Sequence, residues 1–155
     1  MKETNNSPLS EILREYKEAA ERGEADAQYH LGFSYYLGTN LVNQNYDEAV
    51  KWLQRAAEQG HIAAMGVLGC CYEDGFGVNQ DYSEAVKYYQ KAAEQGDCDS
   101  QRNLGECYHF GHGVSQNYDK AMEWHRKAAE QSDEDAMLCL GNCYLDIQDY
   151  KKAMK

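Results

Sequence analysis

One fifteen-residue phrase occurs three times in this chain and constrains its fold more than any other feature. It reads YDEAVKWLQRAAEQG from Tyr46, YSEAVKYYQKAAEQG from Tyr82 and YDKAMEWHRKAAEQS from Tyr118, so successive copies begin 36 residues apart. A period of this length is typical of solenoid proteins, in which each repeat is one supersecondary unit stacked on its neighbours. At least three repeats are needed to bury a continuous core, and this chain has three complete copies.

Each copy has the hydrophobic periodicity of an amphipathic α-helix, which we call the B helix of its repeat. In the first copy, Tyr46, Ala49, Leu53 and Ala56 fall at i, i+3, i+7 and i+10, so they form one stripe along a helix. The residue before each copy is a preferred N-cap type, and in two copies a glutamate completes a capping box. These N-terminal signals are Asn45 with Glu48, Asp81 with Glu84, and Asn117 without a glutamate.

The ends of the B helices are also marked. Gly60 and Gly96 follow the first two copies at the C′ position, where the left-handed conformation favours glycine. Ser132 replaces this glycine after the third copy, so we expect that helix to end less cleanly.

A second phrase precedes each B helix and carries a Leu-Gly pair within a predicted helix, the A helix. The pairs are Leu31-Gly32, Leu68-Gly69, Leu104-Gly105 and Leu140-Gly141. Glycine inside a helix costs about 1 kcal/mol relative to alanine, so its recurrence indicates that another helix passes too close for a side chain. Each repeat is therefore predicted to be two antiparallel helices, joined by a loop such as residues 75–78.

The combined pattern A-x3-LG-x2-Y-x2-G-x-GV followed by A-x2-W/Y-x3-AA-x-QG resembles the Sel-1-like repeat. The resemblance covers roughly residues 9–155. That family is an α-solenoid related to tetratricopeptide repeats, so the resemblance implies an all-α, right-handed superhelix with the A helices on its concave side. Its members are mostly adaptors that assemble other proteins. The resemblance thus implies a scaffold that binds a protein or peptide partner, and not an enzyme.

The repeat pattern divides one predicted domain, residues 1–155, into six segments. They are a disordered leader at 1–7, an N-terminal half-repeat helix at 8–23, repeats at 24–60, 61–96 and 97–132, and a shortened, incomplete fourth repeat at 133–155. Within the last segment we expect a loop at 146–148 and a second helix that stops after about two turns. That ending favours a trimmed chain over an atypical natural cap. Tyr150, Ala153 and Met154 would leave a hydrophobic edge there, which offers a surface for self-association.

The net charge and composition of the chain limit the classes of partner that it can bind and the cellular compartments in which it can lie. The net charge of −11 argues against nucleic acid and anionic membranes, and it favours a basic or amphipathic protein partner. No apolar run is long enough to span a membrane, and no apolar N-terminal segment reads as a signal peptide. The better explanation of the charge is an acidic solvated surface, which keeps an elongated solenoid soluble.

Six cysteines invite a disulfide or metal interpretation. Cys71, Cys107 and Cys143 form one repeat column, and neighbouring repeats lie about 8–10 Å apart, too far for a disulfide. We therefore expect buried free thiols in a reducing cytoplasm. The alternative implied by the family is a secreted cysteine-rich protein with β-lactam-hydrolase-like activity. Its stapling cysteines are replaced here by alanines, at Ala57, Ala64, Ala93 and Ala129.

No motif predicts a cofactor or a catalytic site, and the best metal candidate is weak. Cys107, His109 and His112 bring three soft ligands together near the end of an A helix and its loop, but Cys107 belongs to the structural column. Cys139 and Cys143 have ligand spacing at i, i+4 without a second pair. His125 occupies the column of Leu53 and is interpreted as a packed histidine.

A binding surface is predicted on the A helices. In the first A helix Ala27, Leu31 and Tyr35 face the core, which leaves the other face solvated. That face carries aromatic residues only in repeat one, and in tetratricopeptide proteins it lines the concave groove. Exposed aromatics at a groove are typical anchors for a peptide partner. The predicted partner-binding residues are Tyr29, Phe33, Tyr36, Cys70, Glu73, Arg102, Glu106 and His109. Coverage of this face by the N-terminal half-repeat is the alternative.

Overall fold

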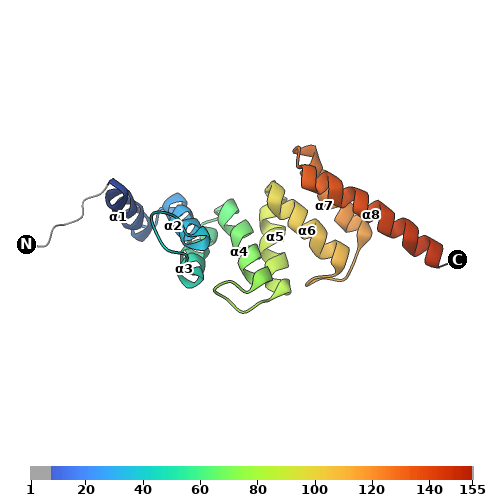
Figure 1. Ribbon diagram of the computed structural model, residues 1–155, viewed down its shortest axis with the longest axis horizontal. Coiled ribbons are helices and arrows are strands. Elements are labelled where there is room, and N and C mark those ends of the chain that lie inside the picture. The colour runs from blue at the N-terminus through green and yellow to red at the C-terminus, as the bar shows by residue number, and fades with distance from the viewer. Residues whose placement is uncertain (1–7, 155) are drawn as a thin grey trace, which may run out of the picture. The chain divides into compact units, whose positions relative to one another are not determined.

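A computed structural model describes residues 8–154, and all regular structure in that range is α-helical. Its helices are α1 (Pro8–Glu21), α2 (Ala25–Leu37), α3 (Tyr46–Glu58), α4 (Ile62–Asp74), α5 (Tyr82–Glu94), α6 (Cys98–Phe110), α7 (Tyr118–Glu130) and α8 (Glu134–Ala153) (Figure 1). The predicted leader at 1–7 lies outside the described residues. None of the described helices combines the length and apolarity that crossing a bilayer requires.

The helices form two compact units that divide between Gln80 and Asp81. Unit 1 contains α1 to α4, and unit 2 contains α5 to α8. Within each unit, helices that follow one another in the chain pack together, with the largest contacts between α2 and α3 and between α6 and α7. These are the A and B helices of repeats one and three, so the predicted all-α fold of helix pairs is confirmed.

The predicted N-caps are present, but at Asn45 the reciprocal half of the capping box is not. The side chain of Asn45 accepts a hydrogen bond from the backbone N–H of Glu48 at 3.1 Å. The backbone N–H of Asn45, which a capping box would pair with the glutamate, donates instead to the carbonyl oxygen of Tyr35. Glu48 turns outward and pairs with Lys51. The A helix of the same repeat therefore satisfies the group that the capping box would have satisfied.

Ser132 does not disturb the end of the third B helix, contrary to expectation. It adopts φ +69°, close to the φ of Gly60 (+85°). Its backbone N–H donates to Ala129 at 2.9 Å, as that of Gly60 does to Ala57. Within residues 8–154, Ser132 is the one non-glycine residue with positive φ, so serine bears the steric cost there and the helix end is preserved.

Two of the Leu-Gly glycines, Gly32 and Gly105, lie where helices touch, as predicted. A Cβ atom on Gly32 would lie 2.9 Å from Cγ of Leu53 and 3.1 Å from the carbonyl oxygen of Ala49. Glycine therefore lets α2 approach the backbone of α3. Beside this contact lies a cluster of buried side chains that unites the half-repeat with repeat one: Ala20, Ala27, Leu31 and Trp52, with Leu13, Ala19 and Tyr35 packed against it.

The fourth repeat differs from the prediction. The expected loop at 146–148 is absent from the described chain, because α8 continues without a break from Glu134 to Ala153. Since no second helix folds back on this part of α8, a Cβ atom on Gly141 would have no described neighbour within 4 Å, unlike one on Gly32 or Gly105. Loss of the Gly-x-Gly turn removes the left-handed residues that stop the other A helices, so the helix propagates.

Candidate functional site

Three aromatic side chains of α2, predicted to bind a partner, form a stacked row on unit 1. The ring of Phe33 stacks on those of Tyr29 and Tyr36, with centroid separations of 5.6 and 6.2 Å. Their spacing of i, i+4 and i+7 places them on one helix face. We expected this face to be solvated, but all three residues are half-buried, because each ring covers part of its neighbour.

Rings from other elements extend this row. Tyr46, the first residue of α3, stacks on Phe76 at 4.4 Å, and Phe76 comes from the loop that follows α4. Both rings lie beside Tyr36, at 5.8 and 6.3 Å. At the other end, the ring of His61 stacks on Tyr29 at 4.5 Å. We call these six side chains the aromatic row: Tyr29, Phe33, Tyr36, Tyr46, His61 and Phe76.

Sequence reasoning did not place Tyr46 and Phe76 in this row. Tyr46 belongs to the apolar stripe of its helix, and Phe76 belongs to a segment that the sequence predicts as a turn. The link between them is Gly77, where a Cβ atom would lie only 2.4 Å from the carbonyl oxygen of Tyr46. The available signal was the second glycine of Gly-x-Gly, which marks a close approach of the loop to another backbone.

The Tyr36 end of the row is neutral and flanked by acidic groups. Burial, with a further contribution from Cys70, Cys71 and Asp74, raises the pKa of Tyr36 to about 12, so its phenol keeps its proton at neutral pH. Cys70 and Glu73 on α4, both predicted site residues, are half-buried. At the opposite end, Nε2 of His61 lies 3.3 Å from a carboxylate oxygen of the exposed Asp26.

In unit 2 the predicted residue Arg102 is held by carboxylates. Its guanidinium lies 3.0 Å from Asp99 and 3.3 Å from Asp133. Asp133 also caps α8 by accepting from the N–H of Ala136. Arg102 is half-buried, so its charge links α6 to the start of α8 and is largely neutralised within the protein.

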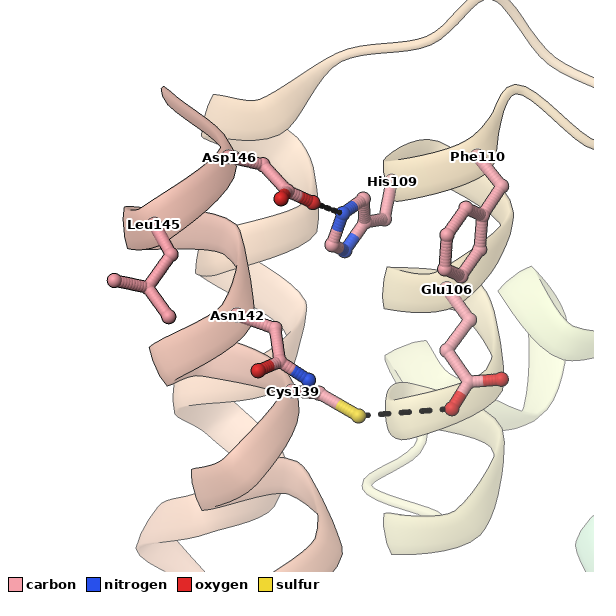
Figure 2. Close-up of a pocket in the computed structure, with 7 residues that line it drawn as sticks. All are labelled: Glu106, His109, Phe110, Cys139, Asn142, Leu145 and Asp146. Carbon is pink, nitrogen blue, oxygen red and sulfur yellow. Dashed lines mark hydrogen bonds and ion pairs between the residues drawn. The ribbon is translucent and has the colours of Figure 1, made fainter. Parts of the chain in front are cut away.

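The other predicted residues of unit 2, Glu106 and His109, line a pocket of about 470 Å³ between α6 and α8. Figure 2 shows Glu106, His109 and Phe110 on one wall, across the pocket from Cys139, Asn142 and Asp146 of α8. Glu106 accepts a hydrogen bond from Sγ of Cys139 at 3.6 Å. The remaining lining residues of α8 are Asn142, Leu145 and Asp146.

His109 is not solvated, contrary to expectation: its side chain is buried, with 4% of its surface exposed. Its Nε2 lies 2.6 Å from Oδ2 of Asp146, and its Nδ1 lies 3.1 Å from Sγ of Cys143 (Figure 2 shows the first contact). A thiol, an imidazole and a carboxylate in this order resemble a nucleophile, its base and an orienting group. However, Cys143 is fully buried, and burial raises the pKa of its thiol to about 11. It is therefore a protonated thiol that a substrate cannot reach.

His125 completes this buried group, as a side chain of α7. Its exposed fraction is 0%, and both ring nitrogens lack a hydrogen-bond partner among the described residues. The ring packs against Gly105, where a Cβ atom would lie 2.6 Å from it. Burial, with the nearby charges of His109 and Arg102, lowers the pKa of His125 to about 4, so the ring is neutral. This confirms the interpretation of His125 as a packed histidine.

The metal candidate suggested by the sequence does not assemble. Cys107 is buried, whereas His112 is exposed and its ring lies against that of Tyr82, 4.9 Å away. Instead, the ligand atoms of His109, His125 and Cys143 lie within 4.8 Å of one another. The sequence could not indicate this set, because its members come from three different helices.

All six cysteines lie within the described residues and none forms a disulfide, as predicted. The column of Cys71, Cys107 and Cys143 is buried, and the other three cysteines are half-buried.

Comparison with known proteins places these observations in a family. A profile of the Sel1 repeat matches residues 25–61, 62–97 and 98–133, which is more than half of the chain. The chain belongs to the Sel1 repeat family. Sel1 repeats are generally protein–protein interaction modules.

Solved structures of Sel1 proteins share the fold. A protective antigen of uropathogenic Escherichia coli aligns with 86% of this chain and 28% of its own, at 42% identity and a TM-score of 0.81. A Sel1 repeat protein from Oxalobacter formigenes aligns with 85% of this chain and 54% of its own, at 39% identity and a TM-score of 0.78. The α-solenoid fold of this Sel1 chain is therefore established.

Two more distant relatives bear on function. The ERAD-associated E3 ubiquitin-protein ligase component HRD3A of Arabidopsis thaliana is 33% identical over 58 residues, which are 37% of this chain and 9% of that protein. Cysteine rich protein B of Helicobacter pylori aligns with 87% of this chain and 96% of its own, at 27% identity and a TM-score of 0.65. The alternative of a cysteine-rich β-lactam hydrolase gains no support, because no disulfide staples the described helices.

Proposed function

We propose that this Sel1 chain is a scaffold or adaptor that binds a protein or peptide partner through the aromatic row of unit 1. The observation that carries this proposal is the row itself, which is assembled from four elements of the unit. Large aromatic side chains dominate the binding energy of many interfaces, because each removes much apolar area from water at little conformational cost. Cys70, Glu73, Arg102 and Glu106 remain further predicted contacts.

The chemistry around the row favours a partner segment with apolar and basic side chains. Half-buried rings present apolar area, and the acidic groups Asp26, Glu73 and Asp74 lie beside the row or on the same elements. The whole chain carries a net charge of −11, which would steer a basic partner towards it and repel an acidic one. An amphipathic helix or extended segment with lysine or arginine fits both features.

The mode of action that we propose is binding without catalysis, in the cytoplasm. The one thiol–imidazole–carboxylate arrangement found in unit 2 is buried, and its thiol is protonated at neutral pH. Six cysteines without a disulfide favour a reducing compartment.

A second contact surface is proposed on α8, where apolar side chains are uncovered. Leu138 and Leu145 are 65% and 60% exposed, and they flank Gly141 on one helix face. At Gly32 and Gly105 the same repeat position accommodates a B helix. We propose that α8 self-associates through this face. Leu138→Glu should then shift the sedimentation coefficient of a concentrated solution to that of the monomer, and a wild-type protein that is monomeric at all concentrations would contradict self-association.

The binding proposal can be tested by selecting peptides from a random display library on the wild-type protein. We expect the selected peptides to combine aromatic or aliphatic residues with lysine or arginine. We expect the Phe33→Asp variant not to bind these peptides. Leu37→Asp is the matched control, because Leu37 lies on the same helix, is 54% exposed and is outside the row. Selected peptides that bind the Phe33→Asp variant as well as wild type would contradict the proposed surface.

A further inference from the structure

A buried side chain of unit 2 lacks the partners that its chemistry requires. His125 is fully buried on α7, and neither ring nitrogen has a hydrogen-bond partner among the described residues. Nearly all buried polar groups in proteins have a partner, and an exception often marks a bound ion or water. A neutral imidazole always offers one nitrogen lone pair, which a metal ion can accept.

Two side chains of ligand-forming types, His109 and Cys143, lie close to His125. Nδ1 of His109 on α6 lies 3.1 Å from Sγ of Cys143 on α8, and one ligand atom from each of the three residues falls within a 4.8 Å span. Tetrahedral zinc, with bonds of about 2.0–2.3 Å, holds its ligand atoms about 3.3–3.8 Å apart. The side chains therefore need to close by only about 1 Å to share an ion.

We propose that His109, His125 and Cys143 form a binding site for a transition-metal ion, with Zn²⁺ as the best match. Imidazole and thiolate are the ligands that zinc prefers, and three protein ligands leave a fourth position for water or another donor. Binding replaces the S–H bond of Cys143 by a sulfur–metal bond and releases that proton to solvent. Both imidazoles bind in their neutral form, so one proton is released for each ion bound.

Asp146 supports His109 in the way that metal-binding histidines are commonly supported. Its Oδ2 lies 2.6 Å from Nε2 of His109. With the Nε2 proton donated to this carboxylate, the lone pair of Nδ1 points to the side where Cys143 lies. A carboxylate behind a ligating histidine fixes the tautomer and raises the basicity of the ring. Both His109 and Asp146 also line the pocket between α6 and α8 (Figure 2).

Unit 1 shows that the fold does not require the two histidines. The residues at the positions of His109, His125 and Cys143 in the A and B phrases around α2, α3 and α4 are Tyr36, Leu53 and Cys71. Leu53 packs against Gly32 as His125 packs against Gly105. An apolar side chain therefore fills this position well, and packing alone gives no reason for a histidine in unit 2.

The test is a titration of the reduced, metal-free full chain with Co²⁺, followed by Zn²⁺. We expect one Co²⁺ per chain, with a thiolate-to-cobalt charge-transfer band in the near ultraviolet that Zn²⁺ abolishes. His125→Leu, which restores the pairing of repeat one, should weaken binding by about tenfold or more and remain folded. Cys143→Ala should remove the charge-transfer band, and Asp146→Asn should weaken binding by about tenfold.

The matched control is Cys71→Ala, which removes a buried thiol from the same repeat column in unit 1 and should bind Co²⁺ as wild type does. Melting curves with and without Zn²⁺ provide a second readout, because an ion that binds only the folded chain raises its melting temperature. We expect that rise in wild type and in Cys71→Ala, and not in His125→Leu. Absence of saturable binding by wild type would overturn the proposal, and so would equal Co²⁺ spectra of wild type and His125→Leu.

Discussion

Gly32 on α2 lies directly against Leu53 on α3: a Cβ atom on this glycine would be 2.9 Å from Cγ of Leu53. Gly141 occupies the same repeat position in α8, yet a Cβ atom there would meet no described atom within 4 Å. The same substitution should therefore have opposite effects at these two sites, which makes them a paired test of the packing.

Gly32→Ala should lower the free energy of unfolding by about 1–3 kcal/mol, because the methyl group forces α2 away from the backbone of α3. Gly141→Ala should raise it by up to about 1 kcal/mol, because alanine favours a helix where there is room for it. Urea denaturation followed by circular dichroism measures both changes. A stabilising Gly32→Ala would show that the two helices are not in close contact.

Trp124 anchors the third B helix and should be costly to remove. Its side chain is 9% exposed, and Nζ of Lys127 lies 4.1 Å from the ring centroid. Trp124→Ala should cost about 3–5 kcal/mol through the cavity that it leaves. Lys127→Ala removes the cation over the ring and an exposed ion pair with Glu123, and should cost about 1 kcal/mol or less. An unchanged melting temperature for Trp124→Ala would contradict the burial of this side chain.

Replacing Ser132 by glycine should stabilise the protein, because Ser132 has φ +69° at the end of a helix. Ser132→Gly should raise the free energy of unfolding by about 0.5–1 kcal/mol, because the left-handed conformation costs serine more than glycine. Gly96 occupies the equivalent position after the second B helix, with φ +93°. The reverse change, Gly96→Ser, should lower the free energy of unfolding by a similar amount. Thermal unfolding of both variants is the measurement, and destabilisation by Ser132→Gly would refute the strain at this residue.

Cys71 should be protected from alkylation in the folded protein. Its buried thiol should also make the free energy of unfolding fall at alkaline pH. Burial, with smaller contributions from Cys70 and Asp74, raises the pKa of its thiol from 9.0 to about 12. The unfolded chain loses this proton at lower pH than the folded chain. The stabilisation of the fold that comes from the protonated thiol is therefore fully present below pH 9, and it is lost as the pH rises towards 12. Mass spectrometry after timed alkylation at about pH 8, close to the ordinary thiol pKa, should show Cys71 modified only on unfolding. Rapid modification of native Cys71 would contradict its burial.

The helix faces and their N-caps were predictable because each depends on residues near one another in sequence. The stripe of Tyr46, Ala49 and Leu53 defines one face of α3, and Asn45 caps it through a residue three positions away. Gly32 signalled a helix contact through recurrence alone, since glycine in a helix needs a compensating reason.

The candidate sites were less predictable because they depend on residues far apart in the chain. Tyr29, Phe33 and Tyr36 follow from helix periodicity, whereas Phe76 joins them only through the path of a loop. His109 shares a column with Glu73, which predicts a solvated position, and its burial follows instead from contacts with α8. The continuity of α8 differs from the prediction because a lost turn resembles a shortened loop in the sequence.

The most direct test of the central claim is the affinity of a selected peptide for wild type and Phe33→Asp, measured by isothermal titration calorimetry. The substitution removes two stacking contacts, so we expect a modest loss of stability and measure well below the melting temperature. The aromatic row predicts binding at least about tenfold weaker in Phe33→Asp, with Leu37→Asp unchanged. Equal affinities of wild type and Phe33→Asp would contradict the claim that this Sel1 chain binds its partner through the aromatic row.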